Sequence, residues 1–113
     1  MDSQPGVGRW VWDVRANRVT WDEALFRIYG LDEGEMAPTY EAYLLRVHPD
    51  DRPLVEKSIK AAVDSREPFS FHERIVRPDG EVRTLHSRGE VVHDEDGSVK
   101  QLIGVCEDVT GPG

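Results

Sequence analysis

The segment Leu102-Ile103-Gly104-Val105-Cys106-Glu107-Asp108-Val109-Thr110 lies close to the end of the chain and predicts its central strand. Alternate residues of a strand point to opposite faces. One face here carries Leu102, Gly104 and Cys106, and the other carries Ile103, Val105 and Val109. Both faces are mainly apolar, as in a strand that is covered on both sides. We therefore expect a neighbouring strand on each side of it. A plain core strand explains the same pattern, so the pattern alone assigns no function.

Composition limits the classes of function. The 113 residues are enough for one domain with its own core and too few for two. The 14 basic and 22 acidic side chains give a formal charge of -8, which argues against nucleic acid or an anionic membrane as the main partner. A single cysteine cannot form an internal disulfide, so we expect a cytoplasmic setting. The sequence shows no long apolar run and no signal peptide, so we expect no membrane contact by this domain.

The first half of the chain predicts a hairpin followed by three short helices. Residues 9–14 and 18–21 alternate around a turn, as hairpin strands do. Asp22 is the expected N-cap of the first helix and Gly30 its stop, and Thr39 is expected to cap the second. The third is expected to start at His48-Pro49-Asp50-Asp51-Arg52 and to run to about Asp64, because proline suits a first helical turn and aspartates there face the positive end of the helix dipole.

The second half predicts an antiparallel meander of three strands. Alternating segments cover residues 69–77, 82–93 and 99–110, and Asp/Gly turns separate them. Residues 1–7 are polar and rich in Gly and Pro, so we interpret them as a tag or linker remnant. The domain is expected over residues 8–110, with residues 111–113 as the start of a linker or the end of the chain.

This order of elements resembles a PAS domain with its PAC region, of the kind found in bacterial sensor kinases and diguanylate cyclases. The resemblance is carried by Gly8-x-Trp10-x-Trp12-Asp13, Trp21 through Tyr29-Gly30-Leu31, Val47-His48-Pro49-Asp50-Asp51-Arg52, Glu73-Arg74-Ile75-Val76-Arg77-Pro78-Asp79-Gly80, and Gly104 with Asp108-Val109-Thr110. It implies an α+β fold: a five-stranded antiparallel sheet in the order 2-1-5-4-3 with short helices on one face. It also implies a sensory module in signal transduction, attached to an output domain such as a histidine kinase or a diguanylate cyclase/phosphodiesterase.

A set of inward-facing residues is expected to surround a ligand pocket between the sheet and the helices. The candidates are Trp10, Trp12, Ile28, Leu44, Val55, Ile59, Phe71, Glu73, Leu85 and Cys106. Glu73 shares a face with Phe71 and Ile75, where an unpaired carboxylate is costly. We expect it to pair with an arginine such as Arg88; the alternative is a polar group of a ligand. Cys106 is a small buried hydrophobe or, alternatively, a thiol that faces a ligand or is oxidised.

The ligand remains unknown from the sequence. The resemblance implies an Asn-Cys-Arg motif for a flavin adduct, a histidine on the long helix for haem, and a helical-side cysteine for coumaric acid, and all three signatures are absent. His48, Asp50 and Asp51 are explained by a capped helix start. His72, His86 and His93 do not share an inward face, so no metal site is expected.

Two further roles are expected at the surface and at the end of the central strand. Val11, Ile103 and Val105 share the sheet face away from the helices, and an apolar stripe of this kind is normally covered. Because the N-terminal segment is short and polar, we expect a second copy to cover it, which makes the chain a homodimer. The resemblance implies that Asp108 and Thr110 form the junction to the output domain.

Three functions compete. The first is a sensory module that binds a small molecule or relays a signal through dimerisation. The second is a protein-interaction adaptor without a ligand. The third is a small enzyme using His48, Asp50 or Cys106, for which no converging nucleophile, base and orienting group is visible. We therefore expect no catalysis by this domain.

Overall fold

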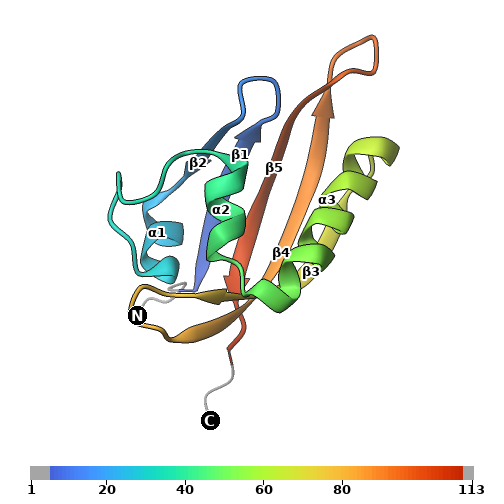
Figure 1. Cartoon of the computed structure of the whole chain (residues 1–113). Coiled ribbons are helices and arrows are strands. Elements are labelled where there is room, and N and C mark those ends of the chain that lie inside the picture. Colours follow the sequence, from blue (N-terminus) through green and yellow to red (C-terminus); the bar gives the residue numbers. More distant parts are fainter. Residues whose placement is uncertain (1–5, 111–113) are drawn as a thin grey trace.

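The computed structural model describes residues 6–110. Its elements follow the predicted order, a hairpin, a helical segment and a meander (Figure 1). They are β1 (Val7–Asp13), β2 (Arg18–Trp21), α1 (Glu23–Tyr29), α2 (Tyr40–Arg46), the 3-10 turn η1 (Pro49–Asp51), α3 (Arg52–Ser65), β3 (Phe69–Val76), β4 (Val82–His93) and β5 (Val99–Asp108).

β5 is the middle strand of a five-stranded sheet, with the order β2-β1-β5-β4-β3 (Figure 1). All neighbouring strands are antiparallel. The predicted α+β architecture and strand order are therefore confirmed. The register places Trp10 of β1 opposite Gly104, and Ser87 of β4 opposite Cys106. Side chains from three neighbouring strands thus meet over the inward face of β5.

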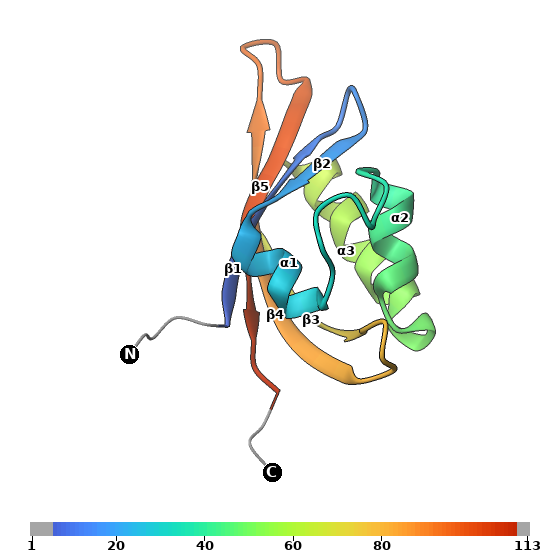
Figure 2. The same cartoon turned by 90° about the vertical axis from the view of Figure 1, so that its left-hand side faces the viewer.

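The three α-helices lie on one side of the sheet, as the edge-on view shows (Figure 2). The Asp22 side chain accepts a hydrogen bond from the Leu25 amide at 2.9 Å, and α1 ends at Gly30, where φ is 71°. Thr39 caps α2 through the Ala42 amide at 3.2 Å. The predicted starts of the first two helices are therefore confirmed. Gly8 allows close contact, because a Cβ there would lie 2.6 Å from the Cα of Leu25.

The segment before α3 differs from the prediction. The chain makes the 3-10 turn η1 before the helix begins at Arg52, and Asp51 does not serve as a side-chain cap. Instead the Asp51 carboxylate accepts hydrogen bonds from the Arg74 backbone amide at 2.8 Å and from its guanidinium at 3.0 and 2.8 Å. The Asp51 carboxylate therefore binds Arg74 of β3 instead of capping the first turn of α3. The contact ties the start of α3 to β3.

Two clusters of buried side chains fill the space between the sheet and the helices. The first contains Trp21, Leu25, Ile28, Tyr29, Leu31, Ile75, Leu85 and Cys106, and the second contains Val47, Val55, Ile59, Phe71 and Leu102. Strand alternation separates the two faces of β5 as predicted. Leu102 and Cys106 are buried beneath the helices, while Ile103 and Val105 lie half-buried on the opposite face.

The sheet begins slightly earlier than the domain boundary expected at residue 8. Val7 is the first residue of β1, and the Gly6 carbonyl accepts a hydrogen bond from the Asp108 amide at 2.6 Å. Residues 1–5 and 111–113, interpreted from the sequence as tag or linker, lie outside the described part of the chain. Across residues 6–110, no helix is long and apolar enough to cross a membrane.

Candidate functional site

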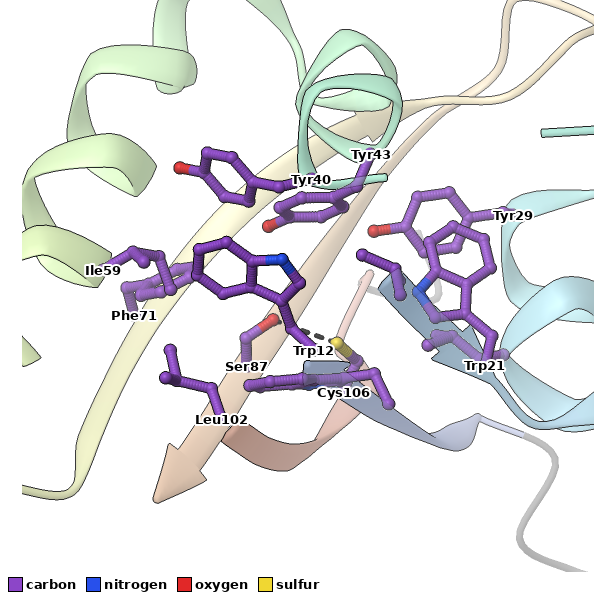
Figure 3. Close-up of a pocket in the computed structure, with 13 residues that line it drawn as sticks. Trp12, Trp21, Tyr29, Tyr40, Tyr43, Ile59, Phe71, Ser87, Leu102 and Cys106 are labelled. Carbon is purple, nitrogen blue, oxygen red and sulfur yellow. Dashed lines mark hydrogen bonds between the residues drawn. The ribbon is translucent and has the colours of Figure 1, made fainter. Parts of the chain in front are cut away.

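A small cavity of about 50 Å³ lies between the sheet and the helices. Thirteen side chains line it (Figure 3): Trp10, Trp12, Val19, Trp21, Leu25, Tyr29, Tyr40, Tyr43, Ile59, Phe71, Ser87, Leu102 and Cys106. These include all three tryptophans and all three tyrosines of the chain. The walls are therefore mostly aromatic, and few polar atoms face the interior.

Two indoles from β1 form part of the wall. Trp10 packs over Gly104, where a Cβ would lie 2.5 Å from Cζ2 of the indole, so only glycine leaves room for the ring. Trp12 stacks on Tyr40 of α2, with ring centroids 4.8 Å apart, and its Nε1 donates a hydrogen bond to the Asn17 side chain at 3.0 Å. These contacts hold both rings at fixed positions beside the cavity.

A buried polar cluster lies behind the aromatic wall. The Tyr43 hydroxyl donates to Glu73 Oε1 at 3.0 Å, and the Ser87 hydroxyl lies 3.1 Å from Glu73 Oε2. Ser87 Oγ is also 3.1 Å from the Cys106 sulfur (Figure 3). The predicted pairing of Glu73 with Arg88 is wrong, because Arg88 is exposed on the opposite face of the sheet. Hydroxyl groups from α2 and β4 take the place of the arginine.

Burial controls the protonation of this cluster. The Glu73 side chain is 1% exposed, and burial raises its pKa to about 7. The hydrogen bonds from Tyr43 and Ser87 act in the opposite direction, and the charge of Asp51 adds a smaller upward effect. Burial also raises the pKa of Cys106 and that of Tyr43. The thiol and the phenol are therefore neutral at physiological pH, and Glu73 is the group of this cluster that titrates there.

Tyr29 contributes an unpartnered hydroxyl to the same cavity. Its side chain is 1% exposed, and its ring packs against Trp21 at a tilt of 33°, with centroids 4.3 Å apart. Its hydroxyl has no hydrogen-bond partner among residues 6–110. Burial raises the pKa of Tyr29, with smaller contributions from the charges of Glu73 and Cys106. A buried hydroxyl without a partner costs about 1–3 kcal/mol, so it marks a place where a ligand or water gains most by binding.

The predicted pocket residues fall into two groups. Trp10, Trp12, Ile59, Phe71 and Cys106 line the cavity. The others pack elsewhere in the core: Ile28, Leu44, Val55, Leu85 and, behind Tyr43 and Ser87, Glu73.

Several lining residues were missed by sequence reasoning. They are Val19, Trp21, Leu25, Tyr29, Tyr40, Tyr43, Ser87 and Leu102. The three tyrosines belong to the two predicted helices that Asp22 and Thr39 cap, and this was the available signal. Which of them reaches the cavity depends on how each helix rotates against the sheet.

The end of β5 is tied to β4 by a compact network. Asp108 Oδ2 accepts hydrogen bonds from Nε and Nη2 of Arg83 at 3.0 and 2.7 Å, and Asp108 Oδ1 accepts one from the Thr110 amide at 2.9 Å. Thr110 Oγ1 in turn accepts from the Thr84 amide at 2.8 Å. Burial acts to raise the pKa of Asp108, but the hydrogen bonds from Thr110 and Arg83 outweigh it and hold the pKa below its usual range. The sequence pointed to Asp108 and Thr110 but not to Arg83.

Comparison with known proteins identifies the family of the chain. Residues 18–106 match the family described as PAS fold. The chain belongs to the PAS family. This PAS domain is 31% identical over 105 residues to the probable diguanylate cyclase DgcE of Escherichia coli (strain K12), a match that covers 93% of the chain and 9% of that protein. It is 27% identical over 104 residues to the sensor protein FixL of Bradyrhizobium diazoefficiens, covering 92% of the chain and 20% of FixL.

A solved structure shares the same fold. The N-terminal domain of a diguanylate cyclase with PAS/PAC sensor from Marinobacter aquaeolei superposes with a TM-score of 0.84 at 20% identity, covering 92% of the chain and 95% of that domain. The PAS domain spans only a small part of the length of the two curated relatives. It is a sensory module of the type present in diguanylate cyclases and sensor proteins.

The outer face of the PAS domain carries a second hollow, on the side of the sheet away from the helices. Val11, Ile103 and Val105, the predicted dimer face, line it together with Arg9 and Arg88. In the strand register Val105 lies between Arg9 and Arg88, and Ile103 lies between Val11 and Glu90.

Further along this outer face of the PAS domain, His72 and His86 stack with ring centroids 4.5 Å apart. In the described range, residues 6–110, no group of three or more His, Cys, Asp or Glu side chains is arranged to hold a metal ion.

Proposed function

We propose that this PAS domain senses a small molecule in its cavity and relays the occupancy of that cavity through β5 to an output domain in the same protein. One observation carries the proposal. Cys106, which lines the cavity, and Asp108, which anchors the end of β5, lie on the same central strand and are separated by a single residue. A displacement of β5 at the cavity therefore has a short, covalent path to the junction.

The size of the cavity supports a small ligand. A site for a drug-sized molecule has a volume of about 300–1,000 Å³. A cavity needs a volume of about 10–15 Å³ to hold one water molecule. The cavity of about 50 Å³ therefore suits a ligand of a few heavy atoms. The aromatic walls and the unpartnered Tyr29 hydroxyl favour a compact molecule with one polar group.

The network at Asp108 supports the relay. Hydrogen bonds among Asp108, Arg83, Thr84 and Thr110 hold the end of β5 and residues 109–110 against β4. Coupling between two sites requires an element with two arrangements that both sites can bias. We propose that the linker after Thr110 is this element and that the Arg83–Asp108 pair holds one of its arrangements.

The output domain is proposed from the relatives. The similarity to DgcE and FixL supports a diguanylate cyclase/phosphodiesterase or a histidine kinase as the attached domain. The acidic charge and the single cysteine are compatible with work in the cytoplasm. The domain itself acts as a regulator and not as a catalyst in this proposal.

Output measurements on the protein that carries the domain test the relay. In the Asp108→Ala and Thr110→Ala variants, output activity is expected to stop responding to the signal while the domain stays folded. Leu45→Ala, an exposed change on α2, is the control and should leave the signal response intact. A normal response in both junction variants would contradict the proposed relay.

A second candidate function is dimerisation through the outer face. The hollow formed by Val11, Ile103 and Val105 favours it, because exposed apolar patches of this kind mark interaction sites. We propose a second copy of the chain as the partner. The same face of two sheets makes a self-complementary contact with two-fold symmetry. This function is compatible with sensing, since a dimer can carry the relayed signal, and it also suits an adaptor without a ligand.

A further inference from the structure

The interior of the domain offers negative and π-rich groups to a ligand. Aromatic rings present a negative electrostatic potential above and below their planes. Six of the lining residues are the tryptophans and tyrosines of the chain, and Phe71 adds another ring. Glu73 lies directly behind this wall, in contact with the lining residues Tyr43 and Ser87.

Within residues 6–110, no cationic side chain balances the charge of the Glu73 carboxylate. No ion pair found within residues 6–110 includes Glu73, and its hydrogen-bond partners are the two neutral hydroxyls. The nearby Asp51 is itself neutralised by Arg74. A buried charge is costly unless it is paired. A ligand that brings a positive charge therefore gains an interaction that no described side chain supplies.

Tyr29 supplies a matching acceptor. Its hydroxyl points toward the middle of the cavity in the close-up view (Figure 3) and has no partner among residues 6–110. A phenol oxygen accepts hydrogen bonds as well as donating one. An ammonium group has three N–H donors and no acceptor. The free lone pairs of the Tyr29 hydroxyl and the unbalanced charge of Glu73 thus both favour a ligand with an ammonium group.

We infer that the cavity binds a small organic cation, a primary ammonium on a short alkyl chain. The Tyr29 oxygen accepts one N–H bond, the surrounding rings contribute cation–π attraction, and the Glu73 carboxylate balances the charge from behind Tyr43 and Ser87. The volume of about 50 Å³ limits the alkyl chain to a few carbons. This inference rests on the proposed ligand-sensing function and names its ligand class.

Other ligand classes fit the same walls less well. A carboxylate ligand would bring a second negative charge close to Glu73. A neutral alcohol of the same size would fill the space and satisfy Tyr29, but would leave the charge of Glu73 unbalanced. Affinity should therefore rank the ammonium above the alcohol, and the alcohol above the carboxylate.

NMR titration of the 113-residue chain with three probes of similar size tests this ranking. The probes are ethylammonium chloride, ethanol and sodium acetate, followed through the amide signals of Tyr29, Ser87 and Cys106. At pH 8 we expect ethylammonium to bind about tenfold more tightly than ethanol, because the charged Glu73 then attracts the ammonium group; this factor corresponds to about 1.4 kcal/mol. At pH 5 this preference should shrink, because Glu73 is then protonated; Tyr29, Tyr43 and Cys106 stay neutral throughout, and Asp51 stays paired with Arg74.

Variants assign the effect to the named groups. Glu73→Gln keeps the size of the side chain and removes its charge, so it should weaken ethylammonium binding about tenfold and leave ethanol binding within about twofold. Glu67→Gln changes an exposed carboxylate and is the matched control, with no change expected. Tyr29→Phe removes only the unpartnered hydroxyl. It gives a second test if Glu73→Gln does not fold, and it should also weaken ethylammonium binding.

The outcomes separate this inference from the function on which it rests. Equal affinity for ethanol and ethylammonium, or tighter binding of acetate, contradicts the inference that the ligand is a cation. It does not contradict the proposal that the cavity binds a small molecule. Ethylammonium binding that is unaffected by Glu73→Gln and by Tyr29→Phe also contradicts the cation inference, because binding then occurs elsewhere. Absence of saturable binding for all three probes contradicts both the cation and the proposed ligand sensing through this cavity.

Discussion

The hydroxyl of Tyr43 on α2 lies 3.0 and 3.3 Å from the two carboxylate oxygens of Glu73 on β3, and so joins the helical layer to the sheet inside the core. A carboxyl group at this depth is expensive in its charged form. The surrounding hydroxyls reduce that cost without removing it, as the raised pKa of Glu73 shows. The stability of the domain and the ligand recognition that we propose therefore depend on the same proton.

The first prediction is that the domain loses stability as the pH rises from about 5 to 8. The pKa of Glu73 is raised from 4.5 to about 7, so the unfolded chain releases this proton at a lower pH than the folded chain does. The stabilisation is complete below the unfolded pKa and is lost as pH rises through the folded one. Because each pKa unit is worth about 1.4 kcal/mol, the loss from Glu73 alone is about 3 kcal/mol.

Urea unfolding of the normal chain and of Glu73→Gln, at pH 5 and at pH 8, measures this loss. The variant cannot ionise at this position, so its stability relative to the normal chain should improve by about 3 kcal/mol between the two pH values. Other titrating groups are common to both chains and cancel in the comparison. A difference that stays the same at both pH values would show that Glu73 does not titrate in this range.

The second prediction concerns the anchor at the end of β5. Asp108→Ala removes the hydrogen bonds from Arg83 and from the Thr110 amide, and we expect it to lower the free energy of unfolding by about 1 kcal/mol. A double-mutant cycle with Arg83→Ala, followed by thermal unfolding, isolates the contribution of the pair. Arg18→Ala, an exposed arginine of β2, is the control. Strictly additive effects of the Asp108 and Arg83 changes would rule out coupling between them.

The strands of the sheet could be predicted well from the sequence, because each strand is specified by the pattern of neighbouring residues. Apolar residues on both faces of residues 102–110 predict a central strand, and this follows from strand alternation alone. The same alternation placed Glu73 on the inward face, and that placement is correct.

Contacts between distant segments were not predictable in this way. Glu73 meets Tyr43, and Asp51 meets Arg74, because of how the helical segment docks on the sheet. Glu73 meets Ser87 because of the register between β3 and β4. Period and spacing carry no information on that docking. The cavity wall was therefore predicted in part, through residues on β1 such as Trp10, while the tyrosines of α1 and α2 were missed.

The third prediction is that Gly104→Ala destabilises the domain by about 2 kcal/mol, the usual cost of overpacking a filled core. The added Cβ would overlap the backbone carbonyl oxygen of Arg88 on β4 and would also lie 2.5 Å from Cζ2 of Trp10, so β4 and the indole must both move away from β5. Tryptophan fluorescence and thermal unfolding report both effects. Gly6→Ala is the matched control, since a Cβ there meets its nearest neighbour at an ordinary 3.5 Å. Equal stability of the two variants would contradict the close fit of Trp10 on Gly104.

The last prediction is that the chain dimerises through Val11, Ile103 and Val105. These side chains line a hollow on the outer face of the sheet, and contact between two copies removes them from water. Burial of apolar surface contributes about 25 cal/mol per Å², and placing a charge in such a contact reverses this gain. Val105→Asp should therefore convert the dimer to a monomer. Because the side chain is on the outer face, the core and the cavity should keep their structure.

Light scattering at high micromolar concentration distinguishes the two states. The normal chain should have twice the mass of the Val105→Asp variant, and both should show the same thermal unfolding behaviour once the concentration dependence of the dimer is taken into account. Leu45→Asp introduces the same charge at an exposed leucine of α2, on the helical side, and should remain a dimer. A normal chain that is monomeric at this concentration contradicts the prediction. A dimer that survives Val105→Asp but dissociates with Leu45→Asp assigns the contact to the helical side instead.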